Sequence, residues 1–324
     1  MLPQFKNFKV GNLSAMLPTD LTQNDIKQIL SSYSVGTYNY HNPLYISPKR
    51  ILYLIKTSSG KYVVKVFEKF ELDHLLFTIS VQKFVIKKNF PIPRIEHTKN
   101  GEPFSKFKGK GIIIQKFLAG RHPKRYSDRL IKNMASTFAK LNKTLMQYPL
   151  QEKCAWKIDY HFQPSNTNAA FNFNMNQEQE KLICEMSKLI KSKLRRSIIH
   201  GDLSNENYLV HKQNITAIID WEKCREDYIA YDIAVFLIGI TGKLQNKVSL
   251  YLQEYEKYLQ LNYEERKAIY YFMKIHMLVI LNWLKKILKK QPDKEISINK
   301  KAQQIIQKYL ALNKLTVEQF MNLP

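Results

Sequence analysis

The sequence contains little cysteine, and its cysteines are not spaced as metal ligands are. Only three of its 324 residues are cysteines, namely Cys154, Cys184 and Cys224. A chain of this length does not need disulfide bonds to hold a core together, and three is an odd number for a disulfide framework. The first residues, MLPQFKNFKVGNL, also lack the continuous apolar run of a signal peptide. We therefore expect a reduced, cytoplasmic protein.

The sequence also lacks a long uninterrupted hydrophobic run. Its most apolar helix-like segment, residues 270–290, contains Lys274, His276 and Asn282. A membrane-spanning helix needs about 20 consecutive, predominantly apolar residues. The segment therefore predicts a buried helix with a basic end, and no membrane partner. Tracts rich in Pro or Gly and blocks of like charge are absent too, which argues against disorder beyond the ends of the chain.

Acidic residues are scarce relative to basic ones. Asp and Glu number 27 against 51 Lys and Arg, which gives a formal net charge of +24. Such a charge is compatible with nucleic-acid binding. However, the lysines are spread along the whole chain, and no zinc-finger, basic-zipper or RNA-recognition motif accompanies them. We expect no specific nucleic-acid partner; the charge instead favours the approach of anionic ligands, nucleotides included.

The residues that are present predict an α+β protein with two lobes. Hydrophobic residues make up 44% of the chain, and its length exceeds that of a typical single domain. Residues 50–69 predict a hairpin with its turn at 58–60, and residues 71–88 predict a helix that ends before two prolines. After 119–123 the pattern becomes mostly helical, with one group of strands at 197–220. This is the coarse layout of a bilobal kinase, in which a small antiparallel-sheet lobe (1–117) lies over a larger helical lobe (118–324).

The span IIHGDLSNENYLV (198–210) carries the strongest chemical signal. His200, Asp202 and Asn207 form the pattern H-x-D-x-x-x-x-N between two apolar runs, and Asp220 ends the next apolar run. Protein kinases use this spacing for their catalytic loop and for a metal-binding Asp. Asp and Asn also favour ordinary turns, but a turn requires neither the histidine nor the third carboxylate. The pattern predicts Asp202 as the catalytic base, His200 as a brace of the loop, and Asn207 and Asp220 as Mg²⁺ ligands.

A phosphate-binding cation is the other group that such chemistry requires. Lys65 alternates with Val64 and Val66 on a predicted strand, so its side chain would reach the nucleotide, although exposed strand lysines are common. Ser47, in the loop before that hairpin, is a candidate to cover the phosphates through backbone amides.

These motifs resemble the aminoglycoside phosphotransferase and choline kinase-like family, which is related to protein kinases. The likeness lies in HGDLSNEN (200–207), IDWE (219–222), YVVKVFEK (62–69), FLAG (117–120) and YDIAVFL (231–237). Within the family the sequence is most similar to bacterial homoserine kinases, through YSVGTY, SGKYVVKVFEK, NFPIPRI, FKGKGIIIQKFLAGR and CREDYIAYDIAVFL. The resemblance implies ATP and Mg²⁺ as cofactors, nucleotide binding by the first lobe, and acceptor binding by the second. It also implies that Asp232 supports the catalytic loop.

Three departures from the family pattern accompany this resemblance. The loop before Leu52 contains no glycine, and the glutamate expected in the first long helix is missing. Its position falls near Thr78, and Glu71 is a weak substitute, so the sequence assigns no partner to Lys65. Asn142 stands where many relatives carry a histidine.

The acceptor remains open at this point. We expect an ATP-dependent kinase of a small-molecule hydroxyl group, with homoserine as the leading acceptor. An aminoglycoside or another amino alcohol is the alternative, provided that Glu222, Glu226 and Asp227 make the site locally acidic. A non-catalytic kinase-fold protein of the spore-coat type is the third possibility, suggested by the missing glycine and glutamate. The sequence predicts no oligomeric state.

Overall fold

The chain divides by its internal contacts into two compact units. The computed structural model describes residues 21–47, 50–68, 71–149, 171, 173, 175–190, 194–240 and 244–323. Of these, the residues up to Arg121 form unit 1 together with Thr216–Ile219, and the remainder from His122 onward form unit 2. The predicted functional lobes, 1–117 and 118–324, stay a prediction.

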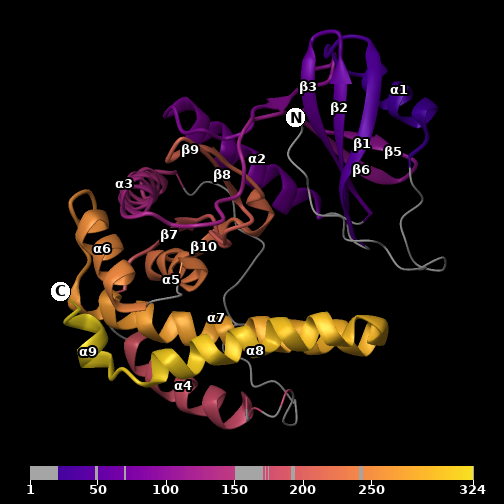
Figure 1. Cartoon of the computed structure of the whole chain (residues 1–324). Helices are drawn as coiled ribbons and strands as arrows, with labels where there is room; N and C mark the ends of the chain where they lie inside the picture. Colours follow the sequence, from indigo (N-terminus) through magenta and orange to yellow (C-terminus); the bar gives the residue numbers. More distant parts are fainter. Residues whose placement is uncertain are drawn as a thin grey trace. The chain divides into compact units, whose positions relative to one another are not determined.

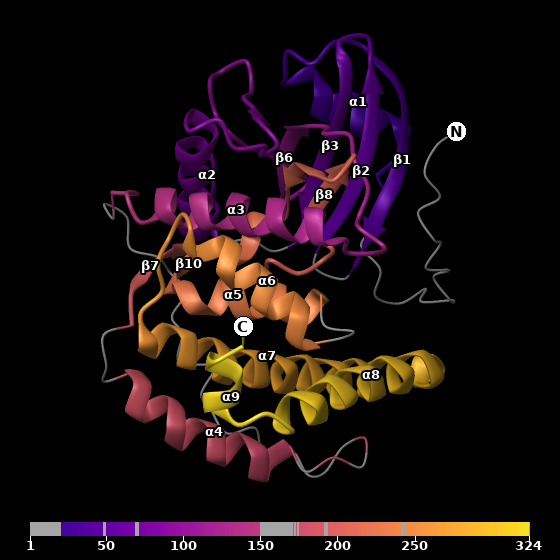
Figure 2. The same cartoon turned by 60° about the vertical axis from the view of Figure 1, so that its left-hand side comes forward.

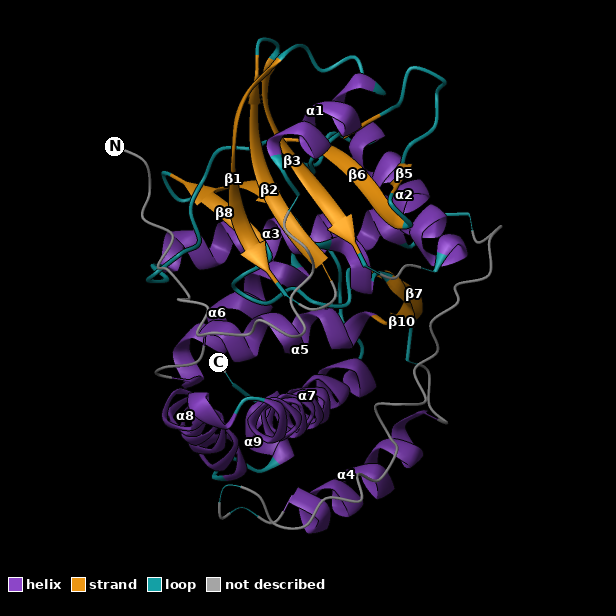
Figure 3. Cartoon of the chain, turned by 90° about the vertical axis from the view of Figure 1, so that its right-hand side faces the viewer, coloured by secondary structure: helices purple, strands orange, loops and turns teal. Residues whose placement is uncertain are grey.

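Unit 1 is built on an antiparallel sheet whose strand order is β1-β2-β3-β6-β4, with β5 also paired to β6. Figure 3 shows the long strands of this sheet side by side. The strands are β1 Tyr38–Ile46, β2 Arg50–Thr57, β3 Gly60–Phe67, β4 Ile95–Glu96, β5 Ser105–Phe107 and β6 Lys110–Lys116, and the helices are α1 Gln23–Ser31 and α2 Leu72–Lys87.

The two helices of unit 1 contribute to two different hydrophobic clusters of the sheet. Residues of β2 alternate between buried and half-buried positions, as the period of a strand dictates. One cluster joins the apolar residues of α1 to β2, β3 and β6, and the other joins Leu75 and Ile79 of α2 to Phe67 and Ile113. The α1 helix starts at a capping box in which Thr22 and Asp25 satisfy each other's backbone N–H groups. The sheet is thereby held between apolar helix faces.

Unit 2 is mainly helical. Its helices are α3 Asp128–Leu145, α4 Met175–Ile190, α5 Ile229–Ile240, α6 Leu244–Glu256, α7 Tyr263–Lys290, α8 Glu295–Asn313 and α9 Val317–Met321. Short antiparallel pairs are formed by β7 Arg196–Ile199 with β10 Arg225–Tyr228, and by β8 Tyr208–His211 with β9 Asn214–Ile218, whose residues from Thr216 onward belong to unit 1. The helix α7 packs against α4, α5, α8 and α9, and α8 runs alongside it in both Figure 1 and Figure 2.

The apolar segment 270–290 lies within α7, and its polar residues have specific partners. The Lys274 ammonium lies 5.5 Å from the ring centroid of Tyr270 and 5.2 Å from that of Tyr309. His276 Nδ1 is 2.9 Å from the Tyr231 hydroxyl of α5. The predicted buried helix is confirmed, and no helix in the described part of the chain is sufficiently long and apolar to traverse a bilayer.

Part of the secondary structure was predicted from the sequence, and three strands were not. The hairpin at 50–69 and the helix at 71–88 appear as β2, β3 and α2. The strands β1, β5 and β10 were not predicted, because β1 lacks an alternating apolar pattern and the other two are short. Of the cysteines, Cys184 is exposed and Cys224 buried, while Cys154 lies outside the described residues.

Candidate active site

The loop His200–Asn207 is held by a buried carboxylate of α5. It connects β7 to β8, and the backbone N–H groups of His200 and Gly201 donate to the two carboxylate oxygens of Asp232, each at 2.8 Å. Asp232 is completely buried. Burial raises the pKa of Asp232 to about 7, against the two backbone hydrogen bonds that lower it. The supporting role that the family resemblance implied for Asp232 therefore has a geometric basis.

Asp202 lies in this loop with one side-chain partner of opposite charge. Its Oδ2 accepts from the Lys223 ammonium at 2.7 Å, and its own side chain is 17% exposed. Burial raises the pKa of Asp202, but the charge and the hydrogen bond of Lys223 outweigh it, so the pKa lies below its usual value. Asp202 is therefore an ionised, partly accessible carboxylate, as a group that orients a hydroxyl must be.

His200 and Asn207 hold the shape of the loop around Asp202. The buried His200 ring packs edge-on against Trp221, with ring centroids 4.7 Å apart, and its Nδ1 accepts from the Asp202 backbone N–H at 3.3 Å. The Asn207 side-chain nitrogen donates to the Asp202 carbonyl at 2.8 Å. Since the amide nitrogen is used in this way, the amide oxygen of Asn207 is directed elsewhere. This arrangement is consistent with His200 supporting the loop and with the side-chain oxygen of Asn207 serving as a metal ligand.

Gly201 is required by the close packing between the loop and residues 223–225. Its φ of +79° lies in the left-handed region, and a Cβ at this position would collide with the Lys223 carbonyl and with the Arg225 guanidinium. Only glycine combines that backbone conformation with so close an approach. The loop and the segment after β9 are thereby packed directly against each other.

Asp220 lies two residues after the end of β9 and adopts a left-handed conformation, with φ 66° and ψ 60°. Asp and Asn tolerate this region better than most other residues. Within the described ranges, no group of three or more His, Cys, Asp and Glu side chains is arranged to hold a metal ion. Mg²⁺ does not require such a group, because it is commonly bound by one or two carboxylates together with substrate phosphates and water. The oxygen donors of Asn207 and Asp220 fit that pattern.

The two predicted nucleotide contacts lie in unit 1. Lys65 is buried on β3, opposite Leu52 of β2 and Ile113 of β6. Strand alternation places it on the same face as Phe67, whose cluster includes residues of α2. Ser47 closes the turn between β1 and β2: its backbone N–H and its hydroxyl both donate to the Arg50 carbonyl, each at 3.0 Å. Its N–H is thus already engaged, and its phosphate contact stays a prediction.

The helix position expected to carry a glutamate is buried in α2. Thr78 donates its hydroxyl to the His74 carbonyl at 2.8 Å, and both residues are buried. Glu71 is the exposed N-cap residue of α2 and makes no side-chain capping bond. At the position near Thr78 where the sequence led us to expect the acid of the kinase pattern, α2 thus carries a small, buried hydroxyl residue.

The sequence assigned no role in the site to Lys223, Arg225, Tyr231 or His276, which are linked to Asp202 or Gly201 directly or through one another. Arg225 forms a fully buried ion pair with Asp227 at 2.7 Å, and its guanidinium lies 4.9 Å from the Tyr231 ring centroid. Burial lowers the pKa of His276 to about 4, although the negative charge of Asp202 opposes this shift. His276 is therefore neutral at physiological pH. The only sequence signal for His276 was that it interrupts an apolar helical segment.

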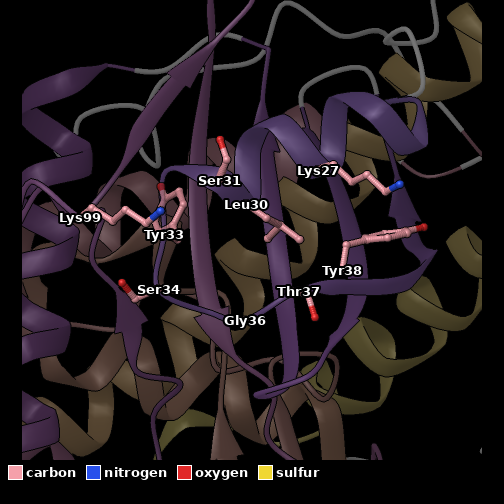
Figure 4. Close-up of a pocket in the computed structure, with 9 residues that line it drawn as sticks. All are labelled: Lys27, Leu30, Ser31, Tyr33, Ser34, Gly36, Thr37, Tyr38 and Lys99. Carbon is pink, nitrogen blue, oxygen red and sulfur yellow. The ribbon is translucent and has the colours of Figure 1, made fainter.

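A separate hollow lies on unit 1, and none of the residues predicted to act in catalysis lines it. Its volume is about 560 Å³, and Figure 4 shows Lys27 and Lys99 at opposite ends of it. Its lining comprises Lys27, Leu30, Ser31, Tyr33, Ser34, Gly36, Thr37, Tyr38 and Lys99. The carbonyl end of α1 borders it, and the negative end of the helix dipole offsets the charge of the lysines. We assign it no ligand.

Comparison with known proteins identifies the family. The sequence pattern of the Phosphotransferase enzyme family matches residues 51–269, more than half of the chain, so the protein belongs to this family. Homoserine kinase of Bartonella henselae is 24% identical over 229 residues, which cover 68% of this chain and 70% of that protein. Homoserine kinase of Rhodopseudomonas palustris is 21% identical over 224 residues, which cover 68% and 69%.

Solved structures show the same fold at low sequence identity. The amicoumacin kinase hAmiN, in complex with AMP-PNP, Ca²⁺ and Ami, superposes with a TM-score of 0.72 at 13% identity, covering 92% of this chain and 95% of that one. The microcompartment-associated aminopropanol kinase has a TM-score of 0.71 at 15% identity, covering 91% and 99%. The predicted protein-kinase-like fold is confirmed, and the protein is a small-molecule kinase.

Proposed function

We propose that this enzyme transfers the γ-phosphoryl group of ATP to a hydroxyl of a small hydroxy amino acid, with homoserine as the leading acceptor. The observation that carries the proposal is the loop His200–Asn207, which presents an ionised Asp202 beside Asn207 and is anchored to Asp232. The homoserine kinases named above and the AMP-PNP complex of hAmiN support the choice of acceptor and nucleotide.

In the proposed reaction Asp202 accepts a hydrogen bond from the acceptor hydroxyl and aims its oxygen at the γ-phosphorus. The bond from that oxygen to phosphorus forms as the bond between phosphorus and the β–γ bridging oxygen breaks. The proton passes to the Asp202 carboxylate, and ADP leaves. Lys65 holds the α- and β-phosphates. Asn207 and Asp220 hold Mg²⁺, which when bound neutralises the charge of the phosphate oxygens.

The charges around the site favour an acceptor with an anionic group over a polycation. Two of the three acidic residues that could have attracted an aminoglycoside are paired with arginines: Asp227 is buried against Arg225, and Glu226 lies 3.3 Å from Arg196. The charge beside Asp202 is the cationic Lys223. An amino acid zwitterion fits these surroundings better than a molecule that bears several ammonium groups.

The experiment that tests the proposal is ADP release from Mg²⁺ and ATP in the presence of homoserine, aminoglycosides and choline. We expect homoserine-dependent turnover by the wild-type protein. Asp202→Ala should turn over at least about 100-fold more slowly, since general-base contributions are about 10²–10⁴-fold. Nucleotide affinity should change little in this variant, because the contact is made at the reacting hydroxyl. Full turnover by Asp202→Ala would contradict the role.

The same experiment separates the alternatives. Turnover with aminoglycosides or choline, but not with homoserine, would show that the acceptor is not homoserine, while the proposed kinase chemistry would stand. Complete absence of nucleotide binding would instead favour a structural kinase-fold protein of the spore-coat type.

A further inference from the structure

Lys223 lies where the acceptor of the proposed reaction must bind. Its ammonium is 2.7 Å from Oδ2 of Asp202, the carboxylate that receives the acceptor hydroxyl in the proposed function. The side chain of Lys223 is 51% exposed, against 17% for Asp202. A molecule that reaches Asp202 from solvent therefore meets the Lys223 ammonium next to it.

The backbone of Lys223 is fixed although its side chain is accessible. Its carbonyl accepts from the buried Arg225 guanidinium at 3.1 Å and lies against Gly201 of the catalytic loop. Residues Trp221–Lys223 form a short 3-10 helix. The next residue, Cys224, closes it by donating its backbone N–H to the Trp221 carbonyl at 2.8 Å. The lysine thus has a rigid base and a long flexible side chain, which lets its ammonium exchange one anionic partner for another.

The neighbouring arginines are held by carboxylates other than Asp202. Arg225 is completely buried against Asp227, and Arg196 lies 3.3 Å from Glu226. Among the residues that the structure describes, the carboxylate partner of Lys223 is Asp202. When Asp202 takes the acceptor hydroxyl, Lys223 is therefore the nearby cation that can bind a second group of the acceptor.

We infer that Lys223 is the specificity-determining residue that binds the carboxylate of the acceptor, which makes small hydroxy amino acids the substrate class. The inference rests on the proposed function. In homoserine the hydroxyl oxygen and the carboxylate carbon are about 5 Å apart in the extended chain. Two adjacent groups of the protein, one anionic and one cationic, can thus take the two ends of such a molecule. The same ammonium would give no advantage to an acceptor without an anionic group.

The test compares two acceptors that differ by one carboxylate. Homoserine and 3-aminopropan-1-ol share the hydroxyl, the chain and the amine, and only homoserine carries the carboxylate. ADP release is measured with the full chain for wild type, Lys223→Ala, Lys223→Arg and the control Lys257→Ala. Lys257 also lies 2.7 Å from a carboxylate, that of Glu254, and is 63% exposed, so this control removes an equal charge and a similar ion pair elsewhere.

We expect Lys223→Ala to lower kcat/KM for homoserine about 10- to 100-fold more than kcat/KM for 3-aminopropan-1-ol, as for the loss of a charge-assisted hydrogen bond that only homoserine can make. Any loss that the two acceptors share reports the ion pair with Asp202, which the variant also removes. Lys223→Arg keeps the positive charge and should recover most of the preference for homoserine, and Lys257→Ala should match wild type. Thermal unfolding of each variant checks that the fold is retained.

Three results would overturn the inference. An equal loss of kcat/KM with both acceptors would limit the role of Lys223 to Asp202 or the transferred phosphoryl group and exclude a contact with the acceptor carboxylate. Wild-type turnover of amino alcohols with none on hydroxy amino acids would exclude a carboxylate contact while leaving the kinase chemistry intact. Absence of turnover with every acceptor would instead overturn the proposed function, and this inference with it.

Discussion

Replacing Asp232 by Ala tests how the catalytic loop is held. The substitution removes the acceptor of two buried backbone hydrogen bonds, from His200 and Gly201, each 2.8 Å long. An unsatisfied buried donor costs about 1–3 kcal/mol, so two such donors cost about 2–6 kcal/mol. Because a typical domain is stable by only about 5–15 kcal/mol, the variant should unfold at much lower urea concentration near pH 5.

The cost of this substitution should also depend on pH. Burial raises the pKa of Asp232 from 3.8 to about 7, so the folded protein holds a proton that the unfolded chain releases between these values. The contribution of Asp232 to stability is therefore greatest below pH 4 and is lost as pH rises through about 7. Between pH 5 and 8 the loss amounts to roughly 2–3 kcal/mol. The destabilisation caused by Asp232→Ala should shrink by that amount over the same range.

Urea unfolding of wild type and variant, followed by circular dichroism at several pH values, provides the measurement. Asp128→Ala is the control, since Asp128 is an exposed acid in the first turn of α3 and should cost no more than about 1 kcal/mol. A destabilisation by Asp232→Ala below about 1 kcal/mol at pH 5 would refute the hydrogen-bond argument. A destabilisation that does not vary with pH would refute the raised pKa.

Two further predictions concern the same loop and Asp220, the predicted Mg²⁺ ligand. Gly201→Ala should be destabilising by several kcal/mol more than Gly101→Ala in thermal or urea unfolding, because both glycines have positive φ but only a Cβ at 201 meets the Lys223 carbonyl. Equal effects of the two substitutions would mean that the contact is unimportant. Asp220→Asn should weaken Mg²⁺-dependent nucleotide binding by about tenfold or more in calorimetry, while Asn tolerates the left-handed backbone. The exposed control Asp293→Asn should bind as wild type does, and unchanged binding by Asp220→Asn would remove its metal role.

Local sequence patterns predicted much of this fold because each feature depends on neighbouring residues. The hairpin of β2 and β3 and the end of α2 before Pro91 both follow from short-range chemistry. The strand β1 was missed, since most of its residues are half-buried or exposed and it contains a proline. Its position is decided by pairing with β2, a contact that no local pattern records.

The sequence alone predicted which residues form the reactive set. The spacing of His200, Asp202 and Asn207, with Asp220 after the following strand, is specific because phosphoryl transfer requires those residue types in that order. Only the tertiary structure decided what surrounds them. The ion pair from Lys223 to Asp202 and the anchoring of the loop by Asp232 join side chains that are well separated along the chain. Folding brings such groups together, and in the proposed function their charges determine which acceptors the site favours.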